Sequence, residues 1–356
     1  MITPMKAAKA GLRLGAYVWY GFSREGEHYT ERLKSEFPGR EPIWGWVEDS
    51  VENMEYQIET AAGYGLSFFA FDWYYGHPGL NRAVDKYLEA GNRSEMAFCL
   101  LVANHEGARI ERAQWEDACD SFIRYMSEDC AVKAYGKPVI IFYDLHNMIE
   151  DLGGCAGVRE CLDHLRKRME PYGGAYIMGC ECPYGTPETG AIDYNEEAFS
   201  PEALKARLDR IARCGFDALT GYNYRRYSPM QGSYELSYKT MTKQHENCWN
   251  AMAEYSDGKY APCILAGWDC RPWETDWQGN TVGYRSCYAP DRTPEVFAGH
   301  IKSAAAWLKE NPEQNPDNLA LIYAWDEVCE GGFLIPTVGE GFSMLEGMKK
   351  ALSELN

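Results

Sequence analysis

Short apolar runs alternate with longer segments of helical periodicity along the chain. The runs are rich in aliphatic, aromatic and β-branched side chains, which is typical of strands that are buried on both faces. Strands are predicted at residues 14–20, 66–72, 96–102, 138–143, 175–180, 218–222, 263–268 and 319–325. Between them, apolar residues repeat at helical spacing, as Val51, Met54 and Ile58 do. Helices are predicted at residues 51–62, 80–90, 115–126, 158–169, 201–214, 234–253, 293–309 and 341–352.

This alternation of buried strands with amphipathic helices indicates a parallel sheet that is covered by helices. An open, doubly wound sheet is the structural alternative, but no G-x-G-x-x-G sequence follows the first strand. The length of 356 residues fits a closed barrel of roughly 250 residues with loop insertions. We therefore predict an α/β fold in which residues 1–356 form a single (β/α)8 barrel, or TIM barrel, with long loops at its C-terminal face.

Polar and aromatic side chains gather where the predicted strands end. In barrels of this type the active site is built at the C-terminal ends of the strands. Aromatic rings offer flat faces to sugars, and cleavage of a glycosidic bond needs a proton donor and a base or nucleophile. Substrate binding is predicted for Trp19, Tyr20, Asp72, Trp73, Tyr74, Asn104, His105, Glu106, Tyr143, Tyr222, Trp268, Asp269 and Trp325. For any single residue, capping of the core or of the next helix is the competing interpretation.

Glu327 and Glu330 follow the last predicted strand directly, with Trp325 before them and Gly331 and Gly332 after them. A lone E-x-x-E sequence is common on solvated helix faces, but this one lies at a strand end, where barrel active sites form. The two glycines permit a tight turn near a ligand. Carboxyl groups at close range push each other's pKa values apart, so that one donates a proton while the other accepts one. We predict Glu330 as the acid/base at the leaving oxygen and Glu327 as the base.

Composition argues against several classes of partner. The net charge of −18 repels nucleic acids and anionic membrane surfaces. The longest apolar runs, such as residues 66–70, are far shorter than the roughly 20 residues of a membrane span. Aromatic residues make up 14% of the chain, with 11 Trp and 25 Tyr, which suits sugar binding but equally suits a generous core.

The 13 cysteines are scattered through the predicted strands and helices and do not resemble the dense framework of a small secreted domain. Cys180 and Cys182 form a close pair without the second pair or the His of a zinc site, so buried thiols are the simpler interpretation. Residues 1–12 lack the apolar stretch and cleavage site of a secretory signal. We expect free thiols in a reducing, cytoplasmic compartment, with a secreted or periplasmic protein as the alternative if a leader was removed.

Several segments resemble glycoside hydrolase family 99 and the family 99-like domains of polysaccharide biosynthesis. The similarity runs nearly end to end, and its most specific parts are GWD at 267–269 and AWDE at 324–327 followed by Glu330 and Gly331. Less specific parts are GAYVWYG at 15–21, QIE at 57–59, FDWY at 71–74 and AN at 103–104. The resemblance implies a retaining, endo-acting α-mannosidase or α-mannanase that acts on an oligosaccharide or polysaccharide and needs no metal or other cofactor.

The resemblance also implies an unusual route for the reaction. One glutamate deprotonates the 2-hydroxyl of the sugar, which attacks the anomeric carbon to give a 1,2-anhydro intermediate, and a second glutamate serves the leaving group. On this chain Glu327 takes the first role and Glu330 the second. The chain departs from the family at Asp326, where the family usually has Asn, and at Val328, where it has Trp. These departures bear on the floor of the sugar site and on the identity of the sugar.

Two other functions stay open from the sequence. The first is a family 99-like carbohydrate-processing or glycan-binding barrel with weak or no hydrolysis, against which the presence of both glutamates argues. The second is a metal-dependent hydrolase that uses His105, His146, Asp72 and Asp269, although none of the 7 His forms an H-x-H or H-E-x-x-H sequence. The sugar, its linkage, endo or exo action and the oligomeric state are not defined by the sequence.

Overall fold

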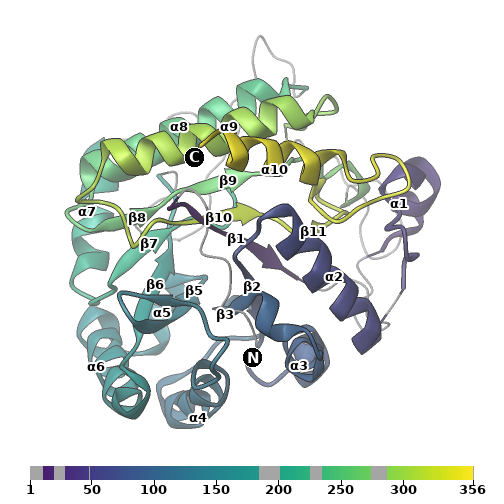
Figure 1. The fold of residues 1–356 in the computed structure, drawn as a ribbon. Helices are drawn as coiled ribbons and strands as arrows, with labels where there is room; N and C mark the ends of the chain where they lie inside the picture. Colours follow the sequence, from purple (N-terminus) through teal and green to yellow (C-terminus); the bar gives the residue numbers. More distant parts are fainter. Residues whose placement is uncertain are drawn as a thin grey trace.

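Nine parallel strands form a barrel in the computed structural model, which describes residues 11–19, 29–47, 49–183, 201–224, 235–273 and 287–355. Their order around the sheet is β8-β7-β6-β5-β3-β2-β1-β10-β9, and Figure 1 shows them inside a layer of helices. Their bounds are β1 Arg13–Val18, β2 Phe68–Trp73, β3 Ala97–Val102, β5 Lys137–Phe142, β6 Tyr176–Cys180, β7 Ala218–Thr220, β8 Lys259–Ala261, β9 Cys263–Leu265 and β10 Leu319–Tyr323. The short strand β4 (Lys133–Ala134) pairs antiparallel with β5. The predicted barrel is confirmed.

Strands β8 and β9 are two halves of one strand position, because only Pro262 separates them. β8 pairs with β7, and β9 pairs with β10. Proline has no N–H group to donate to a neighbouring strand. Its carbonyl oxygen still accepts a hydrogen bond of 3.0 Å from the amide of Leu321. The two halves therefore close a ring of eight strand positions. The prediction of a strand at 263–268 missed β8, since the proline limits that half to a run of three residues.

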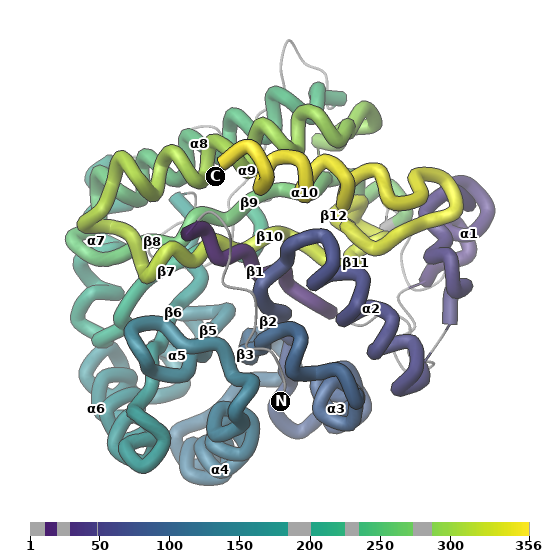
Figure 2. Tube along the Cα trace, viewed as in Figure 1, coloured from purple at the N-terminus to yellow at the C-terminus, as the bar shows by residue number. Residues whose placement is uncertain are grey.

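The helices cover the outside of this ring. Their bounds are α1 Glu31–Glu36, α2 Val51–Tyr64, α3 Arg82–Glu89, α4 Trp115–Met126, α5 Leu145–Asp151, α6 Gly154–Arg168, α7 Pro201–Ala212, α8 Tyr238–Tyr255, α9 Pro294–Glu310 and α10 Ser343–Glu354. Figures 1 and 2 show α8, α9 and α10 along one side of the strands and α3, α4 and α6 on the other. The last helix, α10, contacts both α9 and α2, which closes the helical layer as well. The predicted helices are present with shifted ends, whereas the short helices α1 and α5 were not predicted.

The alternation of side chains along β2 determines what faces the inside of the barrel. Phe71 packs against the ring of Tyr87 in α3, and Trp73 packs 5.3 Å from the ring of Phe122 in α4. Successive residues of a strand point to opposite faces of the sheet. Asp72 therefore points into the barrel, at the carboxyl end of β2.

Two histidines, His245 of α8 and His300 of α9, are buried where these helices pack on the barrel. His245 is fully buried, its ring lies 4.7 Å from that of Tyr224, and its Nδ1 lies 3.3 Å from the carbonyl oxygen of Cys263. Burial is the main cause that lowers the pKa of His245 to about 3, and the neighbouring His300 adds to this effect. The folded protein therefore holds a neutral imidazole at a pH where the unfolded chain is protonated.

We expect the free energy of unfolding to fall as the pH falls from about 6.5 toward 3. In that window the unfolded chain binds a proton that folded His245 excludes, so stability decreases by up to about 1.4 kcal/mol per pH unit for each such group. Urea unfolding at a series of pH values measures this slope. The slope should decrease in His245→Gln, and an unchanged slope in that variant would contradict the assignment.

None of the helices in the described ranges combines the length and apolar character needed to cross a lipid bilayer. All 13 cysteines lie in the described ranges and are free thiols, ten of them buried.

Candidate active site

Glu327 and Glu330 lie on a short β-hairpin at the carboxyl end of β10. In this hairpin β11 (Asp326–Glu327) pairs antiparallel with β12 (Gly332–Phe333). The turn between them is held by a hydrogen bond of 3.2 Å from the amide of Glu330 to the carbonyl oxygen of Glu327. The carboxylate of Asp326 accepts a hydrogen bond of 2.9 Å from the amide of Trp19, which ties the hairpin to the end of β1. Both predicted catalytic residues are thus at the end of the barrel where such sites form.

Glycines allow the hairpin to pack directly against the chain that follows β9. A Cβ atom on Gly331, whose φ is +71°, would lie 2.7 Å from the amide nitrogen of Asp269. A Cβ atom on Gly267 would overlap the carbonyl oxygen of Gly331. The amide of Asp269 also donates a hydrogen bond of 2.7 Å to the carbonyl oxygen of Glu330. Gly331, one of the two glycines predicted to turn near a ligand, therefore packs together with Gly267 closely against backbone atoms beside the two glutamates.

We expect Gly267→Ala to lower the free energy of unfolding by about 1–3 kcal/mol, because backbone atoms on the far side cannot give way to the added methyl group. Displacement of the hairpin should lower any activity at the same time. Gly299→Ala is the matched control, since that exposed glycine of α9 has open space around it and alanine favours a helix. Denaturant unfolding of the two variants tests this, and equal stabilities would contradict the packing role of Gly267.

Two partly buried arginines bind the hairpin from outside. Arg40 donates hydrogen bonds of 3.0 Å to the carbonyl oxygens of Val328 and Asp269. Arg292 donates to the carbonyl oxygens of Gly331 and Phe333, at 3.3 and 3.0 Å. These bonds give donors to carbonyl groups of the hairpin and of the chain that follows β9. Neither arginine was predicted from the sequence, because no local pattern marks a residue that acts on a segment so distant along the chain.

Asp72 and Glu327 share the hydroxyl group of Tyr222. The Tyr222 Oη lies 3.0 Å from Oε1 of Glu327 and 3.2 Å from Oδ2 of Asp72. The three residues come from the ends of three different strand positions. The exposed fraction is 9% for Tyr222, 8% for Glu327 and 5% for Asp72. Beside them, the hydroxyl of Tyr323 donates a hydrogen bond to Oε2 of Glu330, which is half-buried.

This burial shifts the acid–base properties of the cluster. The pKa of Glu327 is raised well above its usual value, first by burial and then by the charges of Glu330, Asp326 and Asp72. The pKa of Asp72 is raised in the same way, by burial and then by Asp326, although the hydrogen bond from Tyr222 opposes the shift. Perturbed carboxyl groups that lie together at a barrel end are characteristic of sites that transfer protons.

Aromatic rings surround the carboxyl groups. The ring of Tyr222 lies 4.9 Å from that of Tyr17, 5.2 Å from that of Tyr143 and 5.1 Å from that of Tyr323. Trp268 continues this set 6.1 Å from Tyr323. Tyr17 and Tyr323 were not predicted as site residues because they lie inside the predicted strands 14–20 and 319–325, although Tyr323 is the last residue of β10 in the structure. Their inward direction at the last positions of a strand is the signal that could have identified them.

A second aromatic group lies on the other side of Tyr143. The ring of His105 lies 6.1 Å from Tyr143 and 5.7 Å from Tyr74. Tyr74 in turn belongs to a small apolar cluster with Trp19 and Ala103. These residues come from the ends of β1, β2 and β3 and from the chain after β5, so the structure brings most of the predicted aromatic residues to one end of the barrel.

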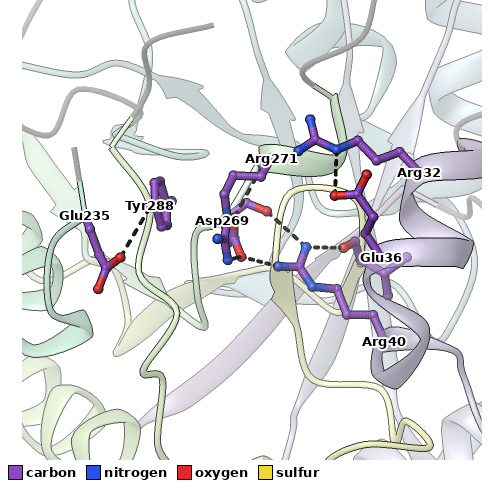
Figure 3. Close-up of polar contacts among 8 residues, drawn as sticks. Arg32, Glu36, Arg40, Glu235, Asp269, Arg271 and Tyr288 are labelled. Atoms are coloured by element: carbon purple, nitrogen blue, oxygen red, sulfur yellow. Dashed lines mark hydrogen bonds and ion pairs between the residues drawn. The ribbon is translucent and has the colours of Figure 1, made fainter. Parts of the chain in front are cut away.

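Asp269 lies at the same end, but two guanidinium groups occupy its carboxylate. Arg40 reaches Oδ2 at 2.5 Å, and Arg271 binds both oxygens at 2.7 and 2.8 Å, as Figure 3 shows. Arg271 itself lies over the ring of Tyr288, with its Cζ 4.1 Å from the ring centre. The site residue predicted from the GWD sequence therefore fixes the neighbouring loops in this structure.

Three other predicted residues make their described contacts outside the carboxyl cluster. Trp73 points outward into the helical layer, as described above. Trp325 is fully buried, and its Nε1 donates a hydrogen bond of 2.8 Å to the side chain of Gln57 in α2. Asn104 uses its side chain to bind both backbone groups of Asp144, at 2.7 and 2.9 Å. Substrate binding by these residues stays a prediction; both faces of the strands are buried, and the sequence does not mark which face is the inner one.

The predicted binding residues also include Glu106 and Tyr20. Glu106 is exposed on the loop after β3, and Tyr20 lies outside the described residues. Within the described ranges, no group of three His, Cys, Asp or Glu side chains is arranged to hold a metal ion. Of the four residues considered for a metal site, Asp269 is bound by the two arginines.

Solved structures share this fold. The GH99 endo-alpha-mannosidase from Bacteroides thetaiotaomicron has a TM-score of 0.62 at 12% sequence identity, covering 96% of this chain and 97% of that one. The beta-glucosidase from Trichoderma harzianum has a TM-score of 0.52 at 9% identity, covering 99% of both chains. At these identities the likeness concerns the fold alone, and it agrees with the fold that the resemblance to family 99 implies.

The sequence of this chain is similar to that of a protein family and of two uncharacterized proteins. The uncharacterized protein WxcX of Xanthomonas campestris pv. campestris, in two strains, is 22% identical over 335 residues. The match covers 84% of this chain but only 41% of those relatives, so the chain spans less than half of their length. Residues 46–348 match the family described as Glycosyltransferase WbsX, a name that differs from the hydrolase family suggested by the sequence motifs. That match extends over most of the barrel, and the chain therefore belongs to the WbsX glycosyltransferase family.

Proposed function

We propose that this protein is a glycan-processing enzyme that hydrolyses an α-linked glycosidic bond with retention of configuration. The observation that carries the proposal is the pair of glutamates on one hairpin, each receiving a hydrogen bond from a tyrosine hydroxyl at the carboxyl end of the barrel. Glycosidic bond cleavage needs two carboxyl groups that flank the bond, one acting as acid and the other as base or nucleophile. The aromatic rings around them offer faces for a sugar ring.

Glu327 is proposed as the base and Glu330 as the acid at the leaving oxygen. Glu327 is almost sealed from water and its pKa is raised, so its ionised form has an increased affinity for a proton such as that of a sugar hydroxyl. Glu330 is more exposed, as suits a group at the leaving part of a longer glycan. We propose further that the base acts on the 2-hydroxyl of the sugar, which displaces the leaving group and gives the retained product after water adds.

The proposed contacts to the sugar are the inward-facing members of the predicted set. They are Trp19, Asp72, Tyr74, His105, Tyr143, Tyr222 and Trp268, together with Tyr17 and Tyr323. Asp269 and Asn104 are proposed to hold the loops in place, and Trp73 and Trp325 belong to the packing of helices against the barrel. Tyr20 and Glu106 stay predictions, as does the single catalytic domain over residues 1–356.

We propose a manno-configured, uncharged glycan as the substrate. The configuration follows from the resemblance to family 99, and the absence of charge follows from the site itself. Asp72, Asp326, Glu327 and Glu330 lie together there, and a carboxylated or phosphorylated sugar would be repelled by them.

Transfer of the glycosyl group is the second candidate function, and the name of the matched family favours it. The same two glutamates would serve, with the hydroxyl group of an acceptor sugar in place of water. The two functions differ in the product and not in the first step. A barrel that binds glycans without turning them over is the remaining alternative.

Incubation with aryl α-mannosides and with α-mannan tests the proposal. We expect release of the phenol and of reducing ends, with the α-anomer as the first product detected by NMR. Aryl α-glucosides are the matched control for sugar configuration, and the double variant Glu327→Gln/Glu330→Gln is the control for the site. New oligosaccharides in the presence of acceptor sugars would favour transfer, and binding without any product would overturn both enzymatic functions.

A further inference from the structure

The hydroxyl group of Tyr222 stands between two carboxyl groups. It lies within hydrogen-bonding distance of Glu327 and Asp72, at 3.0 and 3.2 Å, but it carries a single proton. The hydroxyl can donate that proton to one carboxyl oxygen only. Toward the other carboxyl group its oxygen has to act as the acceptor, which requires that this second group is protonated.

The negative charge of the two carboxyl groups is not balanced by a positively charged side chain in the described ranges. Neither Asp72 nor Glu327 forms an ion pair there. The two arginines that bind the backbone of the hairpin form ion pairs with other acidic residues. Arg40 pairs with Asp269, and Arg292 pairs with Glu340. Two buried charges at this distance without a counter-charge would be strongly unfavourable.

The groups that face Asp72 are themselves acidic or neutral. The hairpin contributes Asp326, Glu327 and Glu330. The end of β7 contributes Tyr222, the end of β2 contributes Tyr74, and β6 contributes the thiol of Cys180. None of these groups offers a positive charge that would favour an ionised Asp72.

The second oxygen of Asp72 indicates which group holds the proton. Oδ1 of Asp72 is buried and has no hydrogen-bond partner among the residues that the structure describes. A buried carboxylate needs several hydrogen-bond donors. The carbonyl oxygen of a neutral acid costs less free energy when it is buried without a donor. In the described part of the chain, Glu327 is not among the residues with a buried oxygen that lacks a partner. Asp72 is therefore the better of the two positions for the proton.

We propose that Asp72 is a neutral carboxylic acid at neutral pH, which donates its proton to Tyr222, and that Tyr222 in turn donates to an ionised Glu327. Asp72 and Tyr222 are then positioning residues, which orient one oxygen of Glu327 and leave it as the charged member of the three. Burial, which raises the pKa of Asp72 well above its usual value, acts in the same direction. A carboxylic acid kept neutral in an apolar site so that it donates a hydrogen bond is known chemistry. The consequence for catalysis rests on the proposed function, but the protonation state does not.

Isotope-edited infrared spectroscopy tests this state in the free protein. The full chain is produced with 13C in its aspartate carboxyl groups, so that the carbonyl stretch of a protonated aspartic acid is separated from those of glutamates and amides. We expect one protonated aspartic acid signal at neutral pH, and we expect Asp72→Asn to remove it. The asparagine amide can still donate to Tyr222, so this variant should fold, and thermal unfolding checks that it does.

Asp326→Asn is the matched control, because Asp326 is a second buried aspartate of the same cluster. The signal should persist in that variant. Absence of the signal in the wild-type protein, or its loss in Asp326→Asn and survival in Asp72→Asn, would overturn the proposal. If Asp72→Asn does not fold, Tyr222→Phe replaces it and should shift the frequency of the signal, since the acceptor of the acid proton is then lost; an unmoved signal would also overturn it.

These results are independent of turnover. A protonated Asp72 in a protein that cleaves no glycoside would refute the proposed hydrolysis and leave the inference intact. Turnover of α-mannosides by a protein without the signal would do the reverse.

Discussion

Glu327→Gln is expected to lose activity toward every glycoside, whatever its leaving group, by a factor on the order of 10²–10⁴ in kcat/KM. The amide cannot accept a proton from the sugar, so the first step loses its base. The hydrogen bond from Tyr222 can be kept by the amide oxygen, and the side chain has nearly the same volume. Stability should therefore change little, and the loss should reflect chemistry.

Steady-state kinetics with a series of aryl α-mannosides of different phenol acidity measures this effect. Glu346→Gln is the control, because that glutamate is exposed on α10. Thermal unfolding of both variants excludes a loss of folded protein. Full activity of Glu327→Gln on any member of the series would remove Glu327 from the role of base.

Glu330→Gln is expected to show a loss that depends on the leaving group. A sugar alkoxide is a poor leaving group and needs a proton, so hydrolysis of α-mannan should fall by a factor on the order of 10²–10⁴. An acidic phenol leaves without protonation, so activated aryl mannosides should lose about tenfold or less. A plot of log kcat/KM against phenol pKa should accordingly become steeper than in the wild-type protein.

The comparison of the two variants decides the roles. An equal loss for all leaving groups in Glu330→Gln, together with a graded loss in Glu327→Gln, would exchange the two assignments. A loss of activity that is equal for all leaving groups in both variants would contradict the assignment of the acid to either glutamate of this hairpin. The bond from Tyr323 to Glu330 gives a further check, since Tyr323→Phe should alter the graded effect while leaving the response of Glu327 in place.

The carboxyl cluster could be predicted in part because strand ends are visible in the sequence. Buried apolar runs mark the strands, and the first polar residue after or at the end of a run marks the position of the site. This rule selected Asp72, Tyr222 and Glu327. In the structure, the hydroxyl group of Tyr222 lies within hydrogen-bonding distance of the other two side chains. It selected Trp73 equally, although neighbouring residues on a strand point to opposite faces.

The sequence by itself determined the alternation of strands and helices, the closure into a barrel and the position of the two glutamates after the last strand. These features follow from local periodicity and from the burial of both strand faces, which a single chain displays directly. Only the tertiary structure decided which side chains point inward, which carboxylates are bound by arginines and which contact the same tyrosine hydroxyl group. Arg40 and Asp269, or Asp72 and Glu327, meet across more than two hundred residues of chain because the ring of strands closes, and such contacts leave no local pattern in the sequence.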